Sequence, residues 1–135
     1  MLAIVDTGPL YAAADLDDEA HEACVAALES QDYDILIPAL VVAEATYLIG
    51  TRLGAGAEAR FLRALEDLHV EAPLPEDWVR VADLVERYAN FPLGGTDATV
   101  IALAERHRAK TLMTLDRRHF AAVKPRHCRA FRLLP

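Results

Sequence analysis

The chain has little cysteine, and its two cysteines are poorly spaced for a metal or redox site. Cys24 and Cys128 form no CxxC pair and lack the spacing of a zinc site, so we expect reduced thiols. Repeats, low-complexity tracts and long linkers are also missing from the 135 residues. This length, with a hydrophobic content of 53%, predicts one compact domain over residues 1–135 with a substantial core.

A membrane-spanning run is absent as well. The most apolar stretch, residues 35–51, contains Pro38 near its start and Glu44 near its centre, whereas a spanning helix needs about 20 apolar residues. Residues 1–6 have no basic start and reach an acid after four apolar residues, which is not typical of a secretory signal. We therefore expect a soluble, cytoplasmic protein without a membrane partner.

Positive charge is scarce over most of the chain and concentrated near its end. The net charge of −7, taken alone, argues against a nucleic-acid partner. However, residues 1–96 carry 5 arginines, no lysine and 18 acids (net −13), while residues 97–135 carry 9 basic and 3 acidic residues (net +6). This asymmetry indicates either a polyanion-binding surface or a solvated basic face that balances the acidic part.

Glu44 is the one charged residue between Asp34 and Arg52. The pattern around it predicts a short strand over residues 35–37, a turn at Pro38 and a buried helix over residues 40–49. A lone carboxylate costs several kcal/mol if it is buried without a partner. Glu44 must therefore reach solvent, pair with a cation or bind a metal.

Strands alternate with helices along the sequence. The expected strands cover residues 2–5, 35–37, 70–72, 111–115 and 130–134. The longer expected helices cover residues 18–30, 40–49, 57–68, 75–88 and 96–107, and shorter ones follow Pro9 and Asp116. Strands separated by helices predict a parallel sheet that is covered on both sides.

Three acids are expected at the ligand-binding edge of this sheet. Asp6 and Asp116 each end a strand, and Asp97 begins a helix. Ligands in open α/β sheets bind beyond the carboxyl ends of the strands. Each acid also has a structural interpretation: Asp97 and Asp116 as helix caps, Asp6 as a turn residue and Glu44 as the partner of an arginine. Together they indicate converging carboxylates, whose repulsion a hard cation such as Mg²⁺ or Mn²⁺ would relieve.

Four blocks of sequence resemble the signature of PIN-domain ribonucleases. They are Ile4-Val-Asp6-Thr-Gly, Val42-Ala-Glu44, Gly95-Thr-Asp97-Ala and Thr114-Leu-Asp116-Arg-Arg-His-Phe120. Their order and spacing resemble VapC toxins of toxin–antitoxin systems, and the resemblance covers nearly the whole chain. It implies a three-layer α/β/α sandwich around a mainly parallel sheet of four to five strands.

The same resemblance implies a Mg²⁺- or Mn²⁺-dependent endoribonuclease that hydrolyses RNA with a metal-activated water. Asp6 and Asp97 are the best candidates for direct metal ligands, while Glu44 and Asp116 would bind metal directly, through water or at a second site. Hydroxyl groups that orient a carboxylate or a metal water are expected at Thr7 and Thr114. In-line attack by water predicts products with 5′-phosphate and 3′-hydroxyl ends.

Because the expected site is acidic, affinity for RNA must come from basic residues elsewhere. Arg117 and Arg118 directly follow one of the acids. The other candidates lie in the same basic third of the chain: Arg106, Arg108, Lys110, Lys124, Arg126 and Arg129. His119 follows the same acid, and we expect it to pack or cap rather than to carry protons.

Partners also follow from the resemblance. It implies a cognate VapB antitoxin whose carboxyl-terminal segment wraps the toxin, and a homodimer with residues 40–68 as a candidate contact surface. Two alternatives remain at this stage. One is a catalytically silent PIN fold that binds RNA or protein. The other is a receiver-like signalling domain, against which stand the missing second acid after Asp6 and the presence of only two lysines, Lys110 and Lys124.

Overall fold

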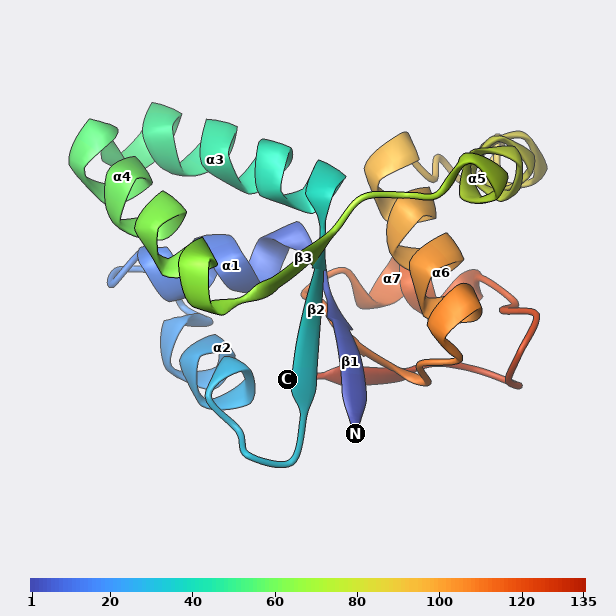
Figure 1. The fold of residues 1–135 in the computed structure, drawn as a ribbon, viewed down its shortest axis with the longest axis horizontal. Coiled ribbons are helices and arrows are strands. Elements are labelled where there is room, and N and C mark those ends of the chain that lie inside the picture. The colour runs from blue at the N-terminus through green and yellow to red at the C-terminus, as the bar shows by residue number, and fades with distance from the viewer.

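A computed structural model describes all residues from Met1 to Pro135, and its elements form three layers (Figure 1). The central sheet contains five strands: β1 (Leu2–Val5), β2 (Asp34–Pro38), β3 (His69–Glu71), β4 (Thr111–Met113) and β5 (Arg132–Leu134). The helices are α1 (Thr7–Ala14), α2 (His21–Leu28), α3 (Ala39–Leu53), α4 (Ala55–Ala64), the 3-10 helix η1 (Leu65–Asp67), α5 (Pro75–Arg87), α6 (Gly95–His107) and α7 (Arg117–Ala122). The predicted α/β/α sandwich is confirmed.

All five strands are parallel, in the order β3-β2-β1-β4-β5. The chain moves outward from β1 through β2 to β3, then returns to the other side of β1 for β4 and β5. The direction of winding therefore reverses between β1 and β4. At this point the backbone N–H of Asp6 donates to the carbonyl oxygen of Met113 at 2.9 Å, so the carboxyl ends of the two strands are fixed side by side. Such a reversal is where open α/β sheets bind ligands.

Helices cover both faces of the sheet. In Figure 1, α1 to α4 lie on one side of strands β1 and β2, and α5 to α7 lie on the other. The β1 residues Ala3, Ile4 and Val5 are fully buried, as expected for a strand covered on both faces. Helix α6 is the most enclosed helix, since every residue from 98 to 104 is buried. No helix of the chain combines the length and apolar character needed to cross a membrane.

Helix α3 is amphipathic, so the prediction of a buried helix around Glu44 is wrong. Only Val41, Ala45 and Ile49 are buried, and they form one stripe with a spacing of four residues. Glu44 is exposed, and Tyr47, which the apolar pattern suggests is a core residue, is 70% exposed. Because α3 runs along the rim of the molecule (Figure 1), only one of its faces meets the core.

The helix ends test the two helix-cap predictions. Helix α6 starts at Gly95 after an N-cap at Gly94, so Asp97 lies in the first turn and the prediction that it caps the helix is wrong. Asp116 is the N-cap of α7, and its carboxylate accepts the backbone N–H of His119 at 3.0 Å. Gly54 separates α3 from α4 with a φ of +91°, a conformation that favours glycine.

Cys24 and Cys128 are both unpaired, and Cys24 is buried in α2.

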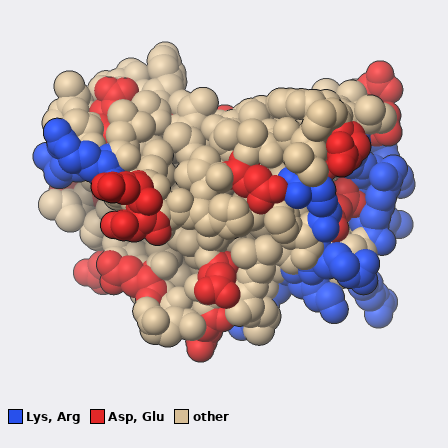
Figure 2. All heavy atoms as spheres, viewed as in Figure 1, with Lys and Arg blue, Asp and Glu red and all other residues tan.

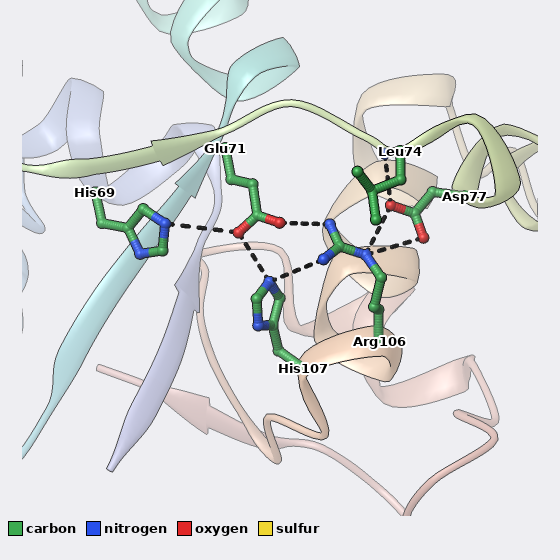
Figure 3. A network of polar contacts seen from close by, with 6 residues as sticks. All are labelled: His69, Glu71, Leu74, Asp77, Arg106 and His107. Atoms are coloured by element: carbon green, nitrogen blue, oxygen red, sulfur yellow. Dashed lines mark hydrogen bonds and ion pairs between the residues drawn. The ribbon is translucent and has the colours of Figure 1, made fainter.

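A polar network joins β3, α5 and α6 on the face opposite α3 (Figure 3). Arg106 of α6 donates from Nη2 to Oε1 of Glu71 at 2.5 Å and from Nε to Oδ2 of Asp77 at 2.9 Å. Asp77, which is only 6% exposed, also accepts the backbone N–H of Leu74 at 2.8 Å. His107 Nε2 lies 2.8 Å from Oε2 of Glu71. The network fixes the start of α5 against the end of α6.

Candidate functional site

A cavity of about 560 Å³ lies at the carboxyl ends of β1 and β4. It brings together the four acids singled out from the sequence, each from a different element: Asp6 after β1, Glu44 on α3, Asp97 in the first turn of α6 and Asp116 after β4. The rest of its lining is Thr7, Gly8, Tyr11, Asp18, Leu48, Arg52 and Leu115.

Asp6 is the most enclosed of the four acids, with 6% of its surface exposed. Its Oδ2 accepts a hydrogen bond from the hydroxyl of Thr114 at 2.8 Å. The same hydroxyl oxygen accepts the backbone N–H of Asp116 at 3.0 Å. Thr114 therefore connects two acids of the cluster through one hydroxyl group. Burial raises the pKa of Asp6, the Thr114 hydrogen bond opposes this, and the charges of Glu44 and Asp116 add to it.

Asp97 has a strongly raised pKa. Burial first, and then the negative charges of Asp6, Asp116 and Glu44, together raise its pKa from 3.8 to about 6, although His119 opposes them. These charges face one cavity without a cation among the four acids, so each favours the protonated form of its neighbours. The arrangement is one that a bound positive charge would stabilise.

His119 holds Asp116 in place from within α7. Its Nδ1 lies 2.8 Å from Oδ2 of Asp116, in addition to the backbone hydrogen bond at the helix start. The imidazole ring packs against Phe91, with 4.6 Å between ring centroids. These contacts place His119 beside the cluster, where it packs and fixes a carboxylate.

The potential metal ligands around the cavity suit a hard cation that keeps part of its water shell. These ligands are carboxylate and hydroxyl oxygen atoms, which Mg²⁺ and Mn²⁺ prefer. The hydroxyl of Thr7 is buried without a hydrogen-bond partner, and a buried polar group in this state is normally satisfied by a ligand or a water. No three His, Cys, Asp or Glu side chains are close enough to enclose an ion directly. One or two direct carboxylates with bridging waters suit Mg²⁺.

Three polar residues of the cavity were not predicted as site residues: Tyr11, Asp18 and Arg52. Tyr11 is on α1 and Asp18 is in the loop after it, outside the four sequence blocks. Arg52 carried a usable signal, because it lies eight residues after Glu44 and so on the same side of a helix. It is the one basic residue that lines this cavity.

The predicted RNA-binding residues do not form one surface around the cavity. Arg117 and Arg118 open α7 beside Asp116, where Arg117 donates to the carbonyl of Pro135 and the Arg118 guanidinium lies 5.1 Å from the centre of the Phe91 ring. Exposed Lys124 follows the same helix.

Two of the predicted residues, Lys110 and Arg126, lie at the other end of the fold. Lys110 precedes β4, whereas Asp116 follows that strand. The backbone N–H of Arg126 donates to the carboxylate of Glu105, near the end of α6. That end of α6 is about 12 Å along the helix from Asp97. Figure 2 shows most Lys and Arg side chains of the visible face gathered at the end of the molecule that carries α5, α6 and the carboxyl-terminal segment.

Comparison with known proteins places these features in context. Residues 3–124 match the PIN domain family. The chain is 34% identical over 134 residues to Ribonuclease VapC26 of Mycobacterium tuberculosis, covering 98% of this chain and 99% of that protein.

Two solved structures share the fold. The crystal structure of M. tuberculosis VapC20, described as a toxin that cleaves the sarcin-ricin loop, has a TM-score of 0.74 at 18% identity and covers 83% of this chain and 87% of its own. A toxin–antitoxin complex from Klebsiella pneumoniae has a TM-score of 0.68 at 21% identity, with 90% and 92% covered.

Proposed function

This chain belongs to the PIN domain family and to its VapC group, and from that premise we propose that it is a metal-dependent endoribonuclease acting as the toxin of a toxin–antitoxin pair. One observation carries the proposal beyond family membership. Asp6, Glu44, Asp97 and Asp116 come from four separate elements and line one cavity at the winding reversal of the sheet. A protein that needed these acids only as caps or turn residues would not bring all four to one cavity.

We propose Asp6 and Asp97 as direct ligands of a Mg²⁺ or Mn²⁺ ion, with Glu44 and Asp116 binding it directly or through water. Such an ion supplies charge neutralisation of the phosphodiester and a lowered pKa for the attacking water. The chain's own residues prepare the site. Thr114 orients the Asp6 carboxylate, His119 fixes Asp116, and Thr7 offers an unused hydroxyl.

The substrate we propose is RNA, bound through its phosphates. Arg117 and Arg118 are the basic residues beside the acids, so they are the first candidates for these contacts. Lys124 is exposed just beyond them, and Lys110 and Arg126 would reach only a substrate that extends to the far end of α6. Phosphate contacts of this kind give affinity without reading sequence.

The deciding experiment is cleavage of RNA by the purified protein with Mg²⁺ or Mn²⁺, beside Asp6→Asn and Asp97→Asn. Wild type should cut, giving 5′-phosphate and 3′-hydroxyl ends, and both variants should lose at least about 100-fold in rate because each removes a metal ligand. Asp83→Asn, an exposed acid of α5, serves as the matched control and should cut normally. Equal cutting by wild type and Asp6→Asn, or 2′,3′-cyclic phosphate ends, would contradict the assignment.

The protein partner we propose is an antitoxin that binds an apolar groove between α1 and α4. The groove has a volume of about 430 Å³, and eight of its nine lining residues are hydrophobic. Leu16, at its margin, is 82% exposed. An apolar groove between two helices suits the apolar face of a partner helix.

A homodimer through α3 and α4 stays a prediction, and light scattering of the purified protein tests it.

A further inference from the structure

The outer part of the acidic cavity contains chemistry that the four acids do not use. Helix α3 contributes Glu44, Leu48 and Arg52 to the lining, at positions i, i+4 and i+8 of one helix face. With a rise of 1.5 Å per residue, Arg52 lies about 12 Å along α3 from Glu44. The α3 side of the cavity therefore carries an acid and, about two helical turns further on, a base.

Arg52 is held by an aromatic ring and not by an acid. Its guanidinium carbon lies 5.0 Å from the centre of the Tyr11 ring, and the Tyr11 hydroxyl donates to Oδ2 of Asp15 at 2.7 Å. Five acids line the same cavity, yet Arg52 takes part in none of the ion pairs of the chain. A guanidinium stacked on a ring keeps N–H donors available for a further acceptor.

The groups between the acids and Arg52 are largely apolar. Leu48 lies on α3 between Glu44 and Arg52, and Leu115, which is 43% exposed, lines the cavity beside Asp116. Together with the Tyr11 ring, these side chains offer a surface against which a sugar or a base can pack. The lining thus offers three kinds of group. They are carboxylates for a cation, an apolar surface, and the N–H donors of the Arg52 guanidinium, which suit a phosphate.

We propose that Arg52 binds a backbone phosphate of the RNA that flanks the cleaved phosphodiester, and that Tyr11 and Leu48 pack against the nucleotide next to it. Because Glu44 and Arg52 are about two helical turns apart on α3, the acids and Arg52 can contact two successive parts of one strand. Arg52 is then a positioning residue, which fixes the register of the strand relative to the acids. This inference rests on the proposed endoribonuclease function.

The test uses the full-length protein and two short RNAs that share the cleavage step mapped with wild type. One is an oligomer with flanking phosphates, and the other is a dinucleotide that has only the cleaved phosphate. Arg52→Ala should lower kcat/KM on the oligomer about ten-fold, mainly through KM, because one charge-assisted contact is lost. Its cleavage of the dinucleotide should match wild type.

A chemical substitution in the RNA locates the contact. Replacing each flanking phosphate in turn by an uncharged methylphosphonate should reproduce the loss at one position in wild type and cause no further loss in Arg52→Ala. Arg63→Ala, an exposed arginine of α4 outside the cavity, should behave as wild type. Arg52→Lys keeps the charge and should recover part of the KM, and thermal unfolding checks that each variant is folded.

The outcomes separate this inference from the function on which it rests. If wild type cuts RNA and Arg52→Ala cuts the oligomer equally well, the phosphate contact is wrong. An equal loss on oligomer and dinucleotide would also overturn it, since Arg52 would then act on the acids or on folding. If Arg52→Ala weakens only the binding of the antitoxin, Arg52 contacts a protein partner and not RNA, and the inference is wrong. A wild-type protein that cuts no RNA would overturn the proposed function itself.

Discussion

Single hydroxyl and imidazole groups control how the acids of the cavity are presented. Thr114 is fully enclosed, at 1% exposure, and its one oxygen donates to Asp6 while accepting from the backbone of Asp116. Asp6 is itself buried, so its carboxylate depends on that hydroxyl for both position and stabilisation. The acids can therefore be disturbed without changing any of them.

Thr114→Val should separate this role from simple packing. The valine has a similar shape but leaves the Asp6 carboxylate and the Asp116 N–H without their partner, so we expect a loss of about 1–3 kcal/mol in the free energy of unfolding. Cleavage should fall about 10- to 100-fold because the carboxylate is no longer oriented. Thr114→Ser retains the hydroxyl and should keep most of the activity. Chemical denaturation and single-turnover cleavage measure the two effects, and full activity in Thr114→Val would show that the hydroxyl is dispensable.

Asp97 should make the metal-free protein less stable as the pH rises. Its pKa is about 6 in the folded chain against an ordinary value of 3.8, so between these values the folded state binds the proton more tightly than the unfolded chain. The resulting stabilisation is present at low pH and is lost as the pH rises through about 6. Relative to Asp97→Asn, wild type in EDTA should lose about 1 kcal/mol between pH 5 and pH 7.5, after allowance for the partial exposure of the group. Urea unfolding at both pH values measures this, and parallel pH profiles of the two proteins would contradict it.

The sequence predicted the position of an acid best where the acid follows a strand. Asp6 and Asp116 could be placed because the carboxyl ends of neighbouring parallel strands meet at one edge. Arg52 and Asp18 could not be placed in the same way, because their position in the cavity depends on how α3 and the loop after α1 pack. Glu44 was also assigned to the cluster, but the reason given was its expected burial, and the structure shows that it is exposed.

At the scale of helices and strands, apolar composition indicated the elements but not their surroundings. Residues 39–53 form one of the most apolar helices of the sequence, yet α3 buries only one stripe because it lies at the rim of the molecule. Helix α6 has a more mixed sequence and is enclosed by β1, α3 and α5. Composition reports how a segment folds locally, whereas its neighbours in space decide how much of it is buried.

The network around Arg106 is an element-scale feature that the sequence did not reveal, since its acids lie 35 and 29 residues away. Arg106→Met should lower the free energy of unfolding by about 2–3 kcal/mol, because Glu71 and the nearly buried Asp77 lose their cationic partner. Arg108→Met, an exposed neighbour, should change stability by less than about 0.5 kcal/mol. Thermal unfolding of the three proteins checks this, and an equal stability for all three would show that the ion pairs contribute nothing.

Acid should weaken the same network. Burial works to raise the pKa of Glu71, but hydrogen bonds from Arg106 and His107 outweigh it and hold the pKa below its usual 4.5. The stabilisation from Glu71 is therefore present at neutral pH and is lost as the pH falls below about 4.5. Arg106→Met should remove this part of the acid sensitivity.

At the scale of the whole molecule, three surfaces of different character are separated in space. The acidic cavity lies at the winding reversal, the apolar groove lies between α1 and α4, and basic side chains gather around α5, α6 and the carboxyl-terminal segment. Separate surfaces allow a substrate and a protein partner to be recognised by different residues.

Phe61→Glu should therefore remove antitoxin binding without removing cleavage. Phe61 lines the apolar groove, and a charge there would be desolvated by any apolar partner, so the affinity for the antitoxin should fall at least about 30-fold. Val79→Glu, at a 66% exposed position of α5, is the matched control. Pull-down with the antitoxin and RNA cleavage measure the two functions. Normal antitoxin binding by Phe61→Glu would move the contact away from the groove.

The central position of β1 in the sheet also determines when the acidic cavity can form during synthesis. Thr114 and Asp6 are 108 residues apart along the chain, and β4 joins β1 only after β2 and β3 have been synthesised. A ribosome adds about 5–20 residues per second. Several seconds therefore pass between the synthesis of Asp6 and that of Asp116. During translation the acidic cavity cannot form until Asp116, its last acid, has been synthesised.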